Sequence, residues 1–291
     1  MTFIKRALLS SFMVLGLNAG ASAQQAQPLS LKVYTADSNF NVTSTLVSGK
    51  SDAVLIDAQF TLADARRLVA EVLSSGKTLK AIYISHGDPD YYFGLEVIRQ
   101  AFPQVPIIAT ASTVAHIKES YQKKLEVWSP RLGANGPHTV IVPEVIQKNF
   151  IELEGQHLDI VAPDAELPEN TFVWIPSIKA VVGGVMIFGD LHVWTADTQK
   201  PAQRQAWIRK LDSIIALQPA TVVPGHLKPG TPTDVSAVKY TRDYLGNFET
   251  ELAKSKDAAG LIKTMQQRYP NSGLGIALDI GAKVNKGEMK W

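Results

Sequence analysis

The chain has 291 residues, no cysteine and a formal net charge of +2 at neutral pH. The lack of cysteine excludes disulfides, thiolate metal ligands and a cysteine nucleophile. Residues 1–23 have the pattern of a secretory signal peptide, because Lys5 and Arg6 precede an apolar stretch that ends in a small-x-small cleavage site at Ala21-Ser22-Ala23. We therefore expect a mature single domain, residues 24–291, that is periplasmic or secreted.

The net charge of the mature chain argues against nucleic acid and anionic membranes as binding partners. Cleavage after Ala23 would remove two of the 29 basic residues and none of the 27 acidic ones, which brings the net charge to zero. A neutral chain offers no electrostatic basis for binding nucleic acid or an anionic membrane. No second long apolar stretch follows, so we expect no membrane contact after cleavage. The expected partner is a small-molecule substrate, and the oligomeric state stays open.

The predicted elements come from hydrophobic periodicity. Apolar and β-branched runs bounded by Ser, Gly and Asp predict strands, and apolar residues at helical spacing predict helices. In chain order we expect strands over 29–35, 41–47 and 53–57, a helix over 62–73, a strand over 81–85, a helix over 94–102, a strand over 105–109, a helix over 112–128, strands over 139–142, 150–154, 158–162, 171–175 and 180–182, a helix over 201–217, a strand over 221–223, and helices over 234–252 and 256–268. This order predicts an α+β fold of four layers, an αββα sandwich.

A polar loop over residues 85–91 follows the buried strand over 81–85 and leads into the next helix. His86, Asp88 and Asp90 alternate along this loop, so their side chains can point into one pocket. In the other interpretation the loop only caps the helix, with Asp88 or Asp90 as the cap and His86 as an ordinary surface histidine. The spacing alone leaves both interpretations open.

The loop resembles the signature of the metallo-β-lactamase superfamily, His-x-His-x-Asp-His followed shortly by Gly. His86 and Asp90 match the first His and the Asp, and Gly94 matches the Gly. Asp88 stands where the second His is expected, and Tyr91 stands where the third is expected. The resemblance therefore implies the fold of this superfamily with an altered metal-binding motif.

Other landmarks extend the resemblance over most of the mature chain. Residues 54–57 resemble the family's strand that ends in Asp, and residues 222–226 resemble its late strand that ends in Pro-Gly-His, which makes His226 an implied ligand. Counted back from Thr171, Glu166 falls where the family has its remaining His. The bridging Asp has two possible registers: a gapless one places Val185 there, and a five-residue shift places Asp190 there. We favour the gapless register.

The implied ligand set is unusual for the superfamily. Val185 binds no metal, so two bridged ions are not expected, and carboxylates in place of histidines suit harder ions such as manganese or iron as well as zinc. The resemblance thus implies one divalent metal ion, Zn, Mn or Fe. Its implied ligands are His86, Asp88, Asp90, Glu166 and His226.

The activity implied by the resemblance is metal-assisted hydrolysis of a small ester, lactone, amide or phosphoester. In this hypothesis Asp90 orients the attacking water or accepts its proton, and His226 or Tyr91 stabilises developing charge or protonates the leaving group. His192 follows the presumed bridging turn and is the implied substrate contact. β-Lactam hydrolysis itself is disfavoured because the His-rich motif is missing.

Two other functions stay open. A non-catalytic binding protein that has lost its metal is favoured by Val185 and Tyr91, and a metal-dependent oxidoreductase is favoured by the carboxylate-rich set. Two further polar features fit an ordinary structure better than a site. His116 lies inside a predicted helix, and Lys123-Lys124 fits a solvated helix face, so neither receives a role.

Overall fold

The computed structural model describes residues 27–36, 40–161 and 165–291. The predicted signal peptide, residues 1–23, lies outside these residues. Within the described ranges, no helix has the length and apolar character needed to cross a lipid bilayer.

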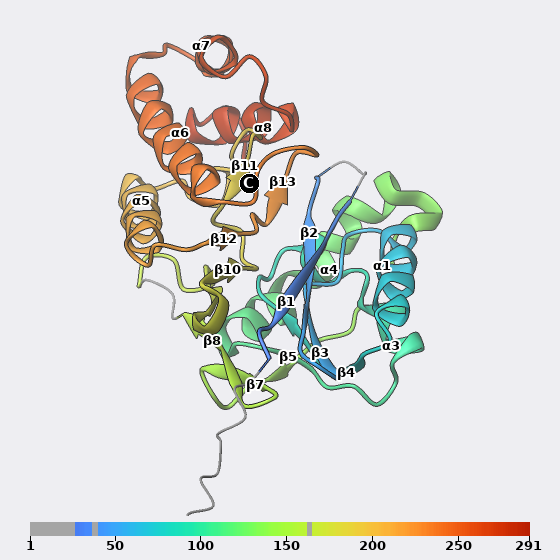
Figure 1. Ribbon diagram of the computed structural model, residues 1–291. Coiled ribbons are helices and arrows are strands. Elements are labelled where there is room, and N and C mark those ends of the chain that lie inside the picture. The colour runs from blue at the N-terminus through green and yellow to red at the C-terminus, as the bar shows by residue number, and fades with distance from the viewer. Residues whose placement is uncertain (1–26, 37–39, 162–164) are drawn as a thin grey trace, which may run out of the picture.

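Two sheets form the middle of the molecule (Figure 1). In spatial order the first contains β1 (Ser30–Thr35), β2 (Thr43–Ser48), β3 (Asp52–Ile56), β4 (Thr78–Ile84), β5 (Ile107–Ala109) and β6 (Glu144–Val145). Its first three strands pair antiparallel, and β3 to β6 pair parallel. The second sheet contains β12 (Thr221–Val222), β10 (Ala180–Val182), β9 (Phe172–Ile175), β8 (Gln156–Val161) and β7 (Phe150–Leu153). A separate parallel pair joins β11 (Phe188–Gly189) to β13 (His226–Leu227).

Helices cover the outer faces of both sheets, which confirms the predicted αββα order (Figure 1). The helices α1 (Leu62–Ser74), α3 (Leu95–Ala101) and α4 (Ala111–Leu132) lie beside the first sheet. The helices α5 (Pro201–Ala216) and α6 (Val235–Lys254) cover the second sheet, and α7 (Ala258–Arg268) and α8 (Gly275–Asn285) follow. The remaining short helices are α2 (Pro89–Tyr92), η1 (Gly133–Asn135) and η2 (Pro176–Ile178).

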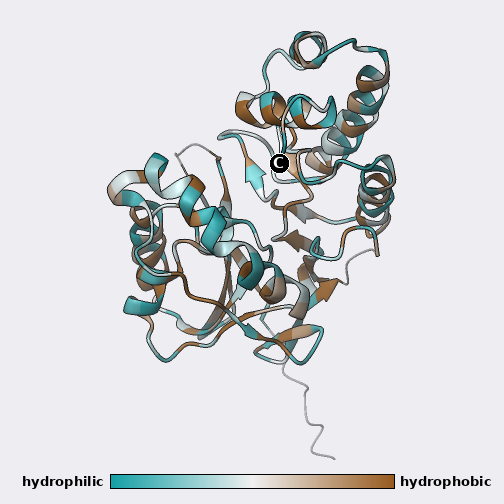
Figure 2. Ribbon diagram, turned by 180° about the vertical axis from the view of Figure 1, so that it is seen from behind, coloured by the Kyte–Doolittle hydropathy of each residue, from teal (hydrophilic) through white to brown (hydrophobic). Residues whose placement is uncertain are grey.

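The central strands are apolar on both sides because each side meets a different layer. In β3, Val54 and Ile56 belong to the core between the two sheets, whereas Ala53 and Leu55 belong to the core under the helices. This alternation follows from the two-residue period of a strand. In Figure 2 several of the inner strands are mainly hydrophobic, whereas the helices carry both hydrophilic and hydrophobic residues.

Several local features differ from the sequence-based expectation, and the short strands β6, β11 and β13 were not predicted. Residues 139–142 are not a strand, because the carboxylate of Glu96 on α3 accepts the backbone N–H groups of His138 and Thr139 at 2.7 and 3.0 Å. Helix α8 was not predicted either. Gly281 is required there: a β-carbon on it would lie 2.4 Å from Oγ1 of Thr195.

Candidate functional site

The candidate site lies where strand ends from both sheets meet. Asp57 follows β3, and the predicted polar loop with His86 follows β4. Gly184 and Val185 follow β10 of the second sheet, and His226 comes four residues after β12 ends at Val222. Polar groups collect at such an edge because the backbone there is no longer used by the sheet.

Asp57 and Gly184 connect the two sheets beneath the site. Asp57 accepts hydrogen bonds from the backbone N–H and the hydroxyl of Ser85 at 2.8 and 2.7 Å. The hydroxyl oxygen of Ser85 in turn accepts the N–H of Gly184 at 2.7 Å. Burial raises the pKa of Asp57 to about 7, although both Ser85 bonds act against this shift. These contacts hold the loops after β4 and β10 together.

Lys124 of α4 forms the centre of a first polar cluster. Its ammonium lies 2.9 Å from Oδ1 of Asp88, 2.9 Å from the carbonyl of Gly87 and 2.8 Å from Nε2 of His116. An ammonium has three N–H donors and no acceptor, so all three donors are used here. Nε2 of His116 must therefore accept, which assigns the ring proton to Nδ1.

The same cluster continues to His86 through carboxylates and a carbonyl. Nδ1 of His116 lies 2.8 Å from a carboxylate oxygen of Glu169, whose backbone carbonyl lies 3.4 Å from Nδ1 of His86. The second oxygen of Asp88 lies 3.2 Å from Nε2 of His86. Asp88 is the N-cap residue of α2 but makes no side-chain capping bond, so its carboxylate is free for Lys124 and His86.

Charges in this cluster follow from these contacts. Burial acts to raise the pKa of Asp88, but the ammonium of Lys124 and the His86 ring outweigh it and hold that pKa well below its ordinary value. Burial acts to lower the pKa of His86, yet the carboxylates of Asp88 and Glu169 raise it overall. The cluster is therefore built from charged partners that neutralise one another.

A second polar cluster contains His226, Tyr91 and Asp90. Nδ1 of His226 donates to the carbonyl of Phe40 at 2.9 Å, and Nε2 lies 3.2 Å from the hydroxyl of Tyr91. Burial lowers the pKa of His226 to about 4, so the ring is neutral and Nε2 accepts from Tyr91. Asp90 lies 3.6 Å from the same Nε2, and burial together with the charge of Asp88 raises its pKa to about 7.

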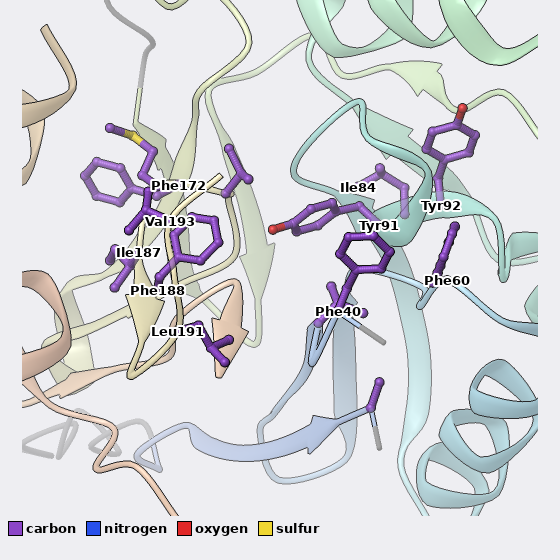
Figure 3. Packing of buried hydrophobic residues seen from close by; sticks show 14 of the residues in the cluster. Phe40, Phe60, Ile84, Tyr91, Tyr92, Phe172, Ile187, Phe188, Leu191 and Val193 are labelled. Atoms are coloured by element: carbon purple, nitrogen blue, oxygen red, sulfur yellow. The ribbon is translucent and has the colours of Figure 1, made fainter. Parts of the chain in front are cut away.

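The two adjacent tyrosines of α2 have different surroundings. Both are buried in the core cluster, and their hydroxyls point in different directions (Figure 3). Tyr91 reaches His226, whereas the buried hydroxyl of Tyr92 has no hydrogen-bond partner among the described residues. Burial raises the pKa of Tyr91 well above its ordinary value, so this phenol keeps its proton.

A cavity of about 480 Å³ opens above both clusters. The polar part of its lining, called the floor below, contains Asp88, Asp90, His116, Lys124 and His226, and Val185 is one of the apolar lining residues. Large apolar side chains make up much of the rest. The aromatic residues of the wall are Phe40, Phe60, Trp128, Phe188, Trp194 and Trp291.

The structure places the candidates of the two registers, Val185 and Asp190, in different surroundings. It lines the cavity together with Asp88 and Asp90, as the gapless register requires. Asp190 is exposed, accepts a hydrogen bond from Oγ1 of Thr231 at 3.1 Å and does not line the cavity. The residue of the gapless register, Val185, therefore lies at the cavity, whereas the residue of the shifted register, Asp190, does not.

Glu166 and His192 lie elsewhere than the resemblance implied. Glu166 is exposed and, among the described residues, shares no ion pair or hydrogen bond with His86. Glu169, three positions later, is the carboxylate that joins the cluster. His192 is buried with Nδ1 3.0 Å from the hydroxyl of Tyr244, and it is not part of the cavity wall.

The sequence analysis missed His116, Lys124 and Glu169. A signal existed: His116, Ser120 and Lys124 are four positions apart in succession, so they share one face of a helix. All three line the cavity. The expectation that Lys124 belongs to a solvated helix face was wrong, because its ammonium points into the site and is only partly exposed.

The described side chains do not fit a metal ion in this arrangement. Among them, there is no group of three or more His, Asp or Glu side chains that could hold a metal ion. The reason is that the donors already have partners. Asp88 pairs with Lys124 and His86, and Nε2 of His226 accepts from Tyr91. A metal would have to displace these contacts before binding.

The sequence model of the metallo-β-lactamase superfamily matches residues 38–226, more than half of the chain. The protein therefore belongs to the metallo-β-lactamase superfamily, as its loop motif and strand ends implied. Divalent metal ions are general in this superfamily, so the paired donors make this chain a divergent member.

Solved structures agree with this assignment. A metallo-β-lactamase from Pontibacter korlensis is 20% identical with a TM-score of 0.54, covering 75% of this chain and 99% of its own. A metallo-β-lactamase family protein from Thermus thermophilus is 16% identical with a TM-score of 0.58, covering 86% and 91%. The DIM-1 metallo-β-lactamase is 19% identical with a TM-score of 0.52, covering 77% and 99%. At such identities the likeness shows the fold alone, and no curated protein matches the chain.

Proposed function

We propose that this protein is a hydrolase for a small, largely apolar ester, lactone or amide. The observation that carries the proposal is the carboxylate of Asp90 on the floor of the aromatic-lined cavity, 3.6 Å from Nε2 of His226. A concave, mostly apolar pocket with a few converging polar groups is the usual form of a small-molecule site. Aromatic walls favour a substrate with an apolar or aromatic acyl group.

The chemistry proposed for this floor is general-base hydrolysis. Asp90 accepts a proton from water as the water oxygen bonds to the acyl carbon, and it returns that proton to the leaving group as the acyl bond breaks. Tyr91 and the carbonyl of Phe40 hold the neutral ring of His226 in place beside Asp90. Lys124 supplies a fixed positive charge near the developing oxyanion.

Metal-assisted hydrolysis, the finer hypothesis from the sequence, is not part of this proposal. Three of its five implied ligands are not available in this arrangement: Asp88 pairs with Lys124, His226 accepts from Tyr91, and Glu166 is exposed away from the cavity. The proposed reaction is therefore still hydrolysis, but none of its steps uses a metal ion.

The test is a screen of para-nitrophenyl esters and aromatic lactones with the purified protein and its Asp90→Asn variant. Loss of a general base lowers kcat/KM by about 10²- to 10⁴-fold. Asp190→Asn is the matched control, because Asp190 is an exposed aspartate outside the cavity. Turnover that survives unchanged in Asp90→Asn contradicts the proposed role of Asp90.

A binding protein is the second candidate function. It is favoured by the mutual pairing of Tyr91 and His226, which leaves no activated side-chain nucleophile in the second cluster. This alternative predicts saturable binding of the same aromatic esters, seen as quenching of tryptophan fluorescence, with no turnover of any of them. Hydrolysis at a rate that depends on Asp90 excludes it.

We also propose export to the periplasm, with small molecules as the partners of the mature protein. The support is the pattern of residues 1–23, with Lys5 and Arg6 ahead of an apolar stretch and Ala23 at the cleavage site. N-terminal sequencing of the protein from a periplasmic extract tests this proposal. A mature N-terminus at Gln24 supports it, and an intact Met1 in the cytoplasmic fraction contradicts it.

A further inference from the structure

The ammonium of Lys124 lies within hydrogen-bond distance of three acceptors. Oδ1 of Asp88, the carbonyl of Gly87 and Nε2 of His116 lie 2.8–2.9 Å from its ammonium and come from two separate elements. Only 18% of the Lys124 side chain is exposed, so this is not a surface ion pair. Three acceptors around one partly buried cation match the three donors of an ammonium.

The outer contacts of this cluster repeat a pattern known from metal sites. A metal-bound histidine usually donates its other ring N–H to a carboxylate, which fixes the ring and its tautomer. Here Nδ1 of His116 lies 2.8 Å from Glu169, while Nε2 faces the ammonium of Lys124. Glu169, His116 and Lys124 are therefore arranged as carboxylate, histidine and cation, with an ammonium where the metal would be.

The second cluster shows the same substitution with a neutral group. Nδ1 of His226 donates to the carbonyl of Phe40, as the outer contact of a metal-bound histidine would. Nε2, which would bind the ion, accepts instead from the hydroxyl of Tyr91. In both clusters one ring nitrogen of the histidine has the outer contact that a metal-bound histidine would have, and a side chain lies where the other ring nitrogen would bind an ion.

We infer that Lys124 is a built-in cation that takes the place of a divalent metal ion, and that removing its ammonium uncovers a divalent-cation site. The uncovered ligands are Asp88, His116 and the carbonyl of Gly87, with Glu169 behind His116. To bind zinc, whose bonds to nitrogen and oxygen are 2.0–2.2 Å, each ligand must move inward by about 0.7 Å. This inference does not depend on the hydrolase proposal, because metal binding is measured without substrate.

The experiment is a calorimetric titration of ZnCl₂ and MnCl₂ into chelator-treated full-length protein, with elemental analysis after dialysis. The wild type is expected to take up no stoichiometric ion. Lys124→Ala is expected to bind about one equivalent, at least about tenfold more tightly than the wild type. Adding His116→Ala to Lys124→Ala is expected to remove this gain, because one ligand of the uncovered site is lost.

Lys123→Ala is the matched control, since Lys123 is the exposed neighbour of Lys124 on the same helix and also lines the cavity. It is expected to titrate like the wild type. Circular dichroism checks folding, and Lys124→Ser replaces Lys124→Ala if that variant does not fold. Stoichiometric uptake by the wild type overturns the inference, and so does a folded Lys124 variant that gains no metal.

Discussion

The hydroxyl of Tyr91 lies 3.2 Å from Nε2 of His226, and the other ring nitrogen of His226 lies 2.9 Å from the carbonyl of Phe40. Both nitrogens of a buried histidine are thereby satisfied, which fixes the ring as a neutral acceptor toward Tyr91. Tyr91 stands in the loop position where the superfamily has a third histidine, so a phenol here completes the contacts of His226 within the protein.

Tyr91→Phe is expected to destabilise the fold. The substitution leaves Nε2 of His226 without its donor in a buried place, and an unsatisfied buried polar group costs about 1–3 kcal/mol. Urea unfolding followed by circular dichroism measures the change in the free energy of unfolding.

The adjacent tyrosine is the matched control for that measurement. The buried hydroxyl of Tyr92 has no hydrogen-bond partner among the described residues, so Tyr92→Phe is expected to be neutral or stabilising. Equal losses in Tyr91→Phe and Tyr92→Phe would show that the contact with His226 does not stabilise the protein.

The sequence allowed the fold and part of the candidate site to be predicted. Strands buried on both faces and the loop after β4 carry local signals, so the sequence pointed to four residues that the structure brings together there, His86, Asp88, Asp90 and His226. Lys124 was missed because its role depends on where α4 packs. A lysine on a helix has the same local pattern whether it faces water or a carboxylate.

Glu166 and Glu169 show that the sequence also does not determine which residue of a loop reaches the site. Counting from a strand locates a loop position only when the loop has the same length and path as in relatives. Here the loop carries Glu169, not Glu166, to His116, with 2.8 Å between carboxylate and ring. Val185 lies at the cavity, as the gapless register expects, because its glycine turn follows β10 directly.

His192 is expected to make the protein less stable in acid. Burial lowers its pKa to about 4 in the folded state, whereas an unfolded histidine titrates near its ordinary value of about 6.5. Between these values the unfolded chain binds more protons, so stability is complete above about pH 6.5 and is lost as the pH falls toward 4. Urea unfolding at pH 7.5, 6.0 and 5.0 measures this loss.

His192→Gln separates this effect from other acid-sensitive groups. Glutamine can keep a hydrogen bond to Tyr244 but does not titrate, so its stability is expected to fall less between pH 7.5 and 5.0. His226 has a lowered pKa in both proteins and gives a shared background. An equally steep fall in both proteins assigns the acid sensitivity to a group other than His192.

Gly184→Ala is expected to be strongly destabilising, by about 3 kcal/mol or more, because two costs add. Gly184 has φ +81°, which side chains rarely adopt, and an added β-carbon would lie 2.1 Å from the carbonyl oxygen of Thr171. Gly76→Ala is the control: Gly76 has φ +65° but nothing within 4 Å of the added carbon, so about 1–2 kcal/mol is expected. Thermal and urea unfolding compare the two variants, and equal costs would show that contact with Thr171 is relieved by local movement.

Trp291 forms part of the cavity wall through a contact with Asp197. Its indole N–H donates to one oxygen of Asp197 at 2.6 Å, and the indole of Trp194 donates to the other oxygen at 2.6 Å. The two rings meet edge to face with centroids 5.2 Å apart. Asp197 therefore holds two aromatic side chains against the cavity.

Trp291→Ala is expected to raise KM for a para-nitrophenyl ester about 2- to 10-fold, because an aromatic contact contributes about 0.5–1.5 kcal/mol. The value of kcat is expected to stay within about twofold, since uniform binding is lost while Asp90 is untouched. Trp291→Phe keeps a ring but lacks the N–H, so it separates aromatic contact from the bond to Asp197. A variant whose kcat falls while KM stays constant would place Trp291 in the chemical step and contradict its assignment to the cavity wall.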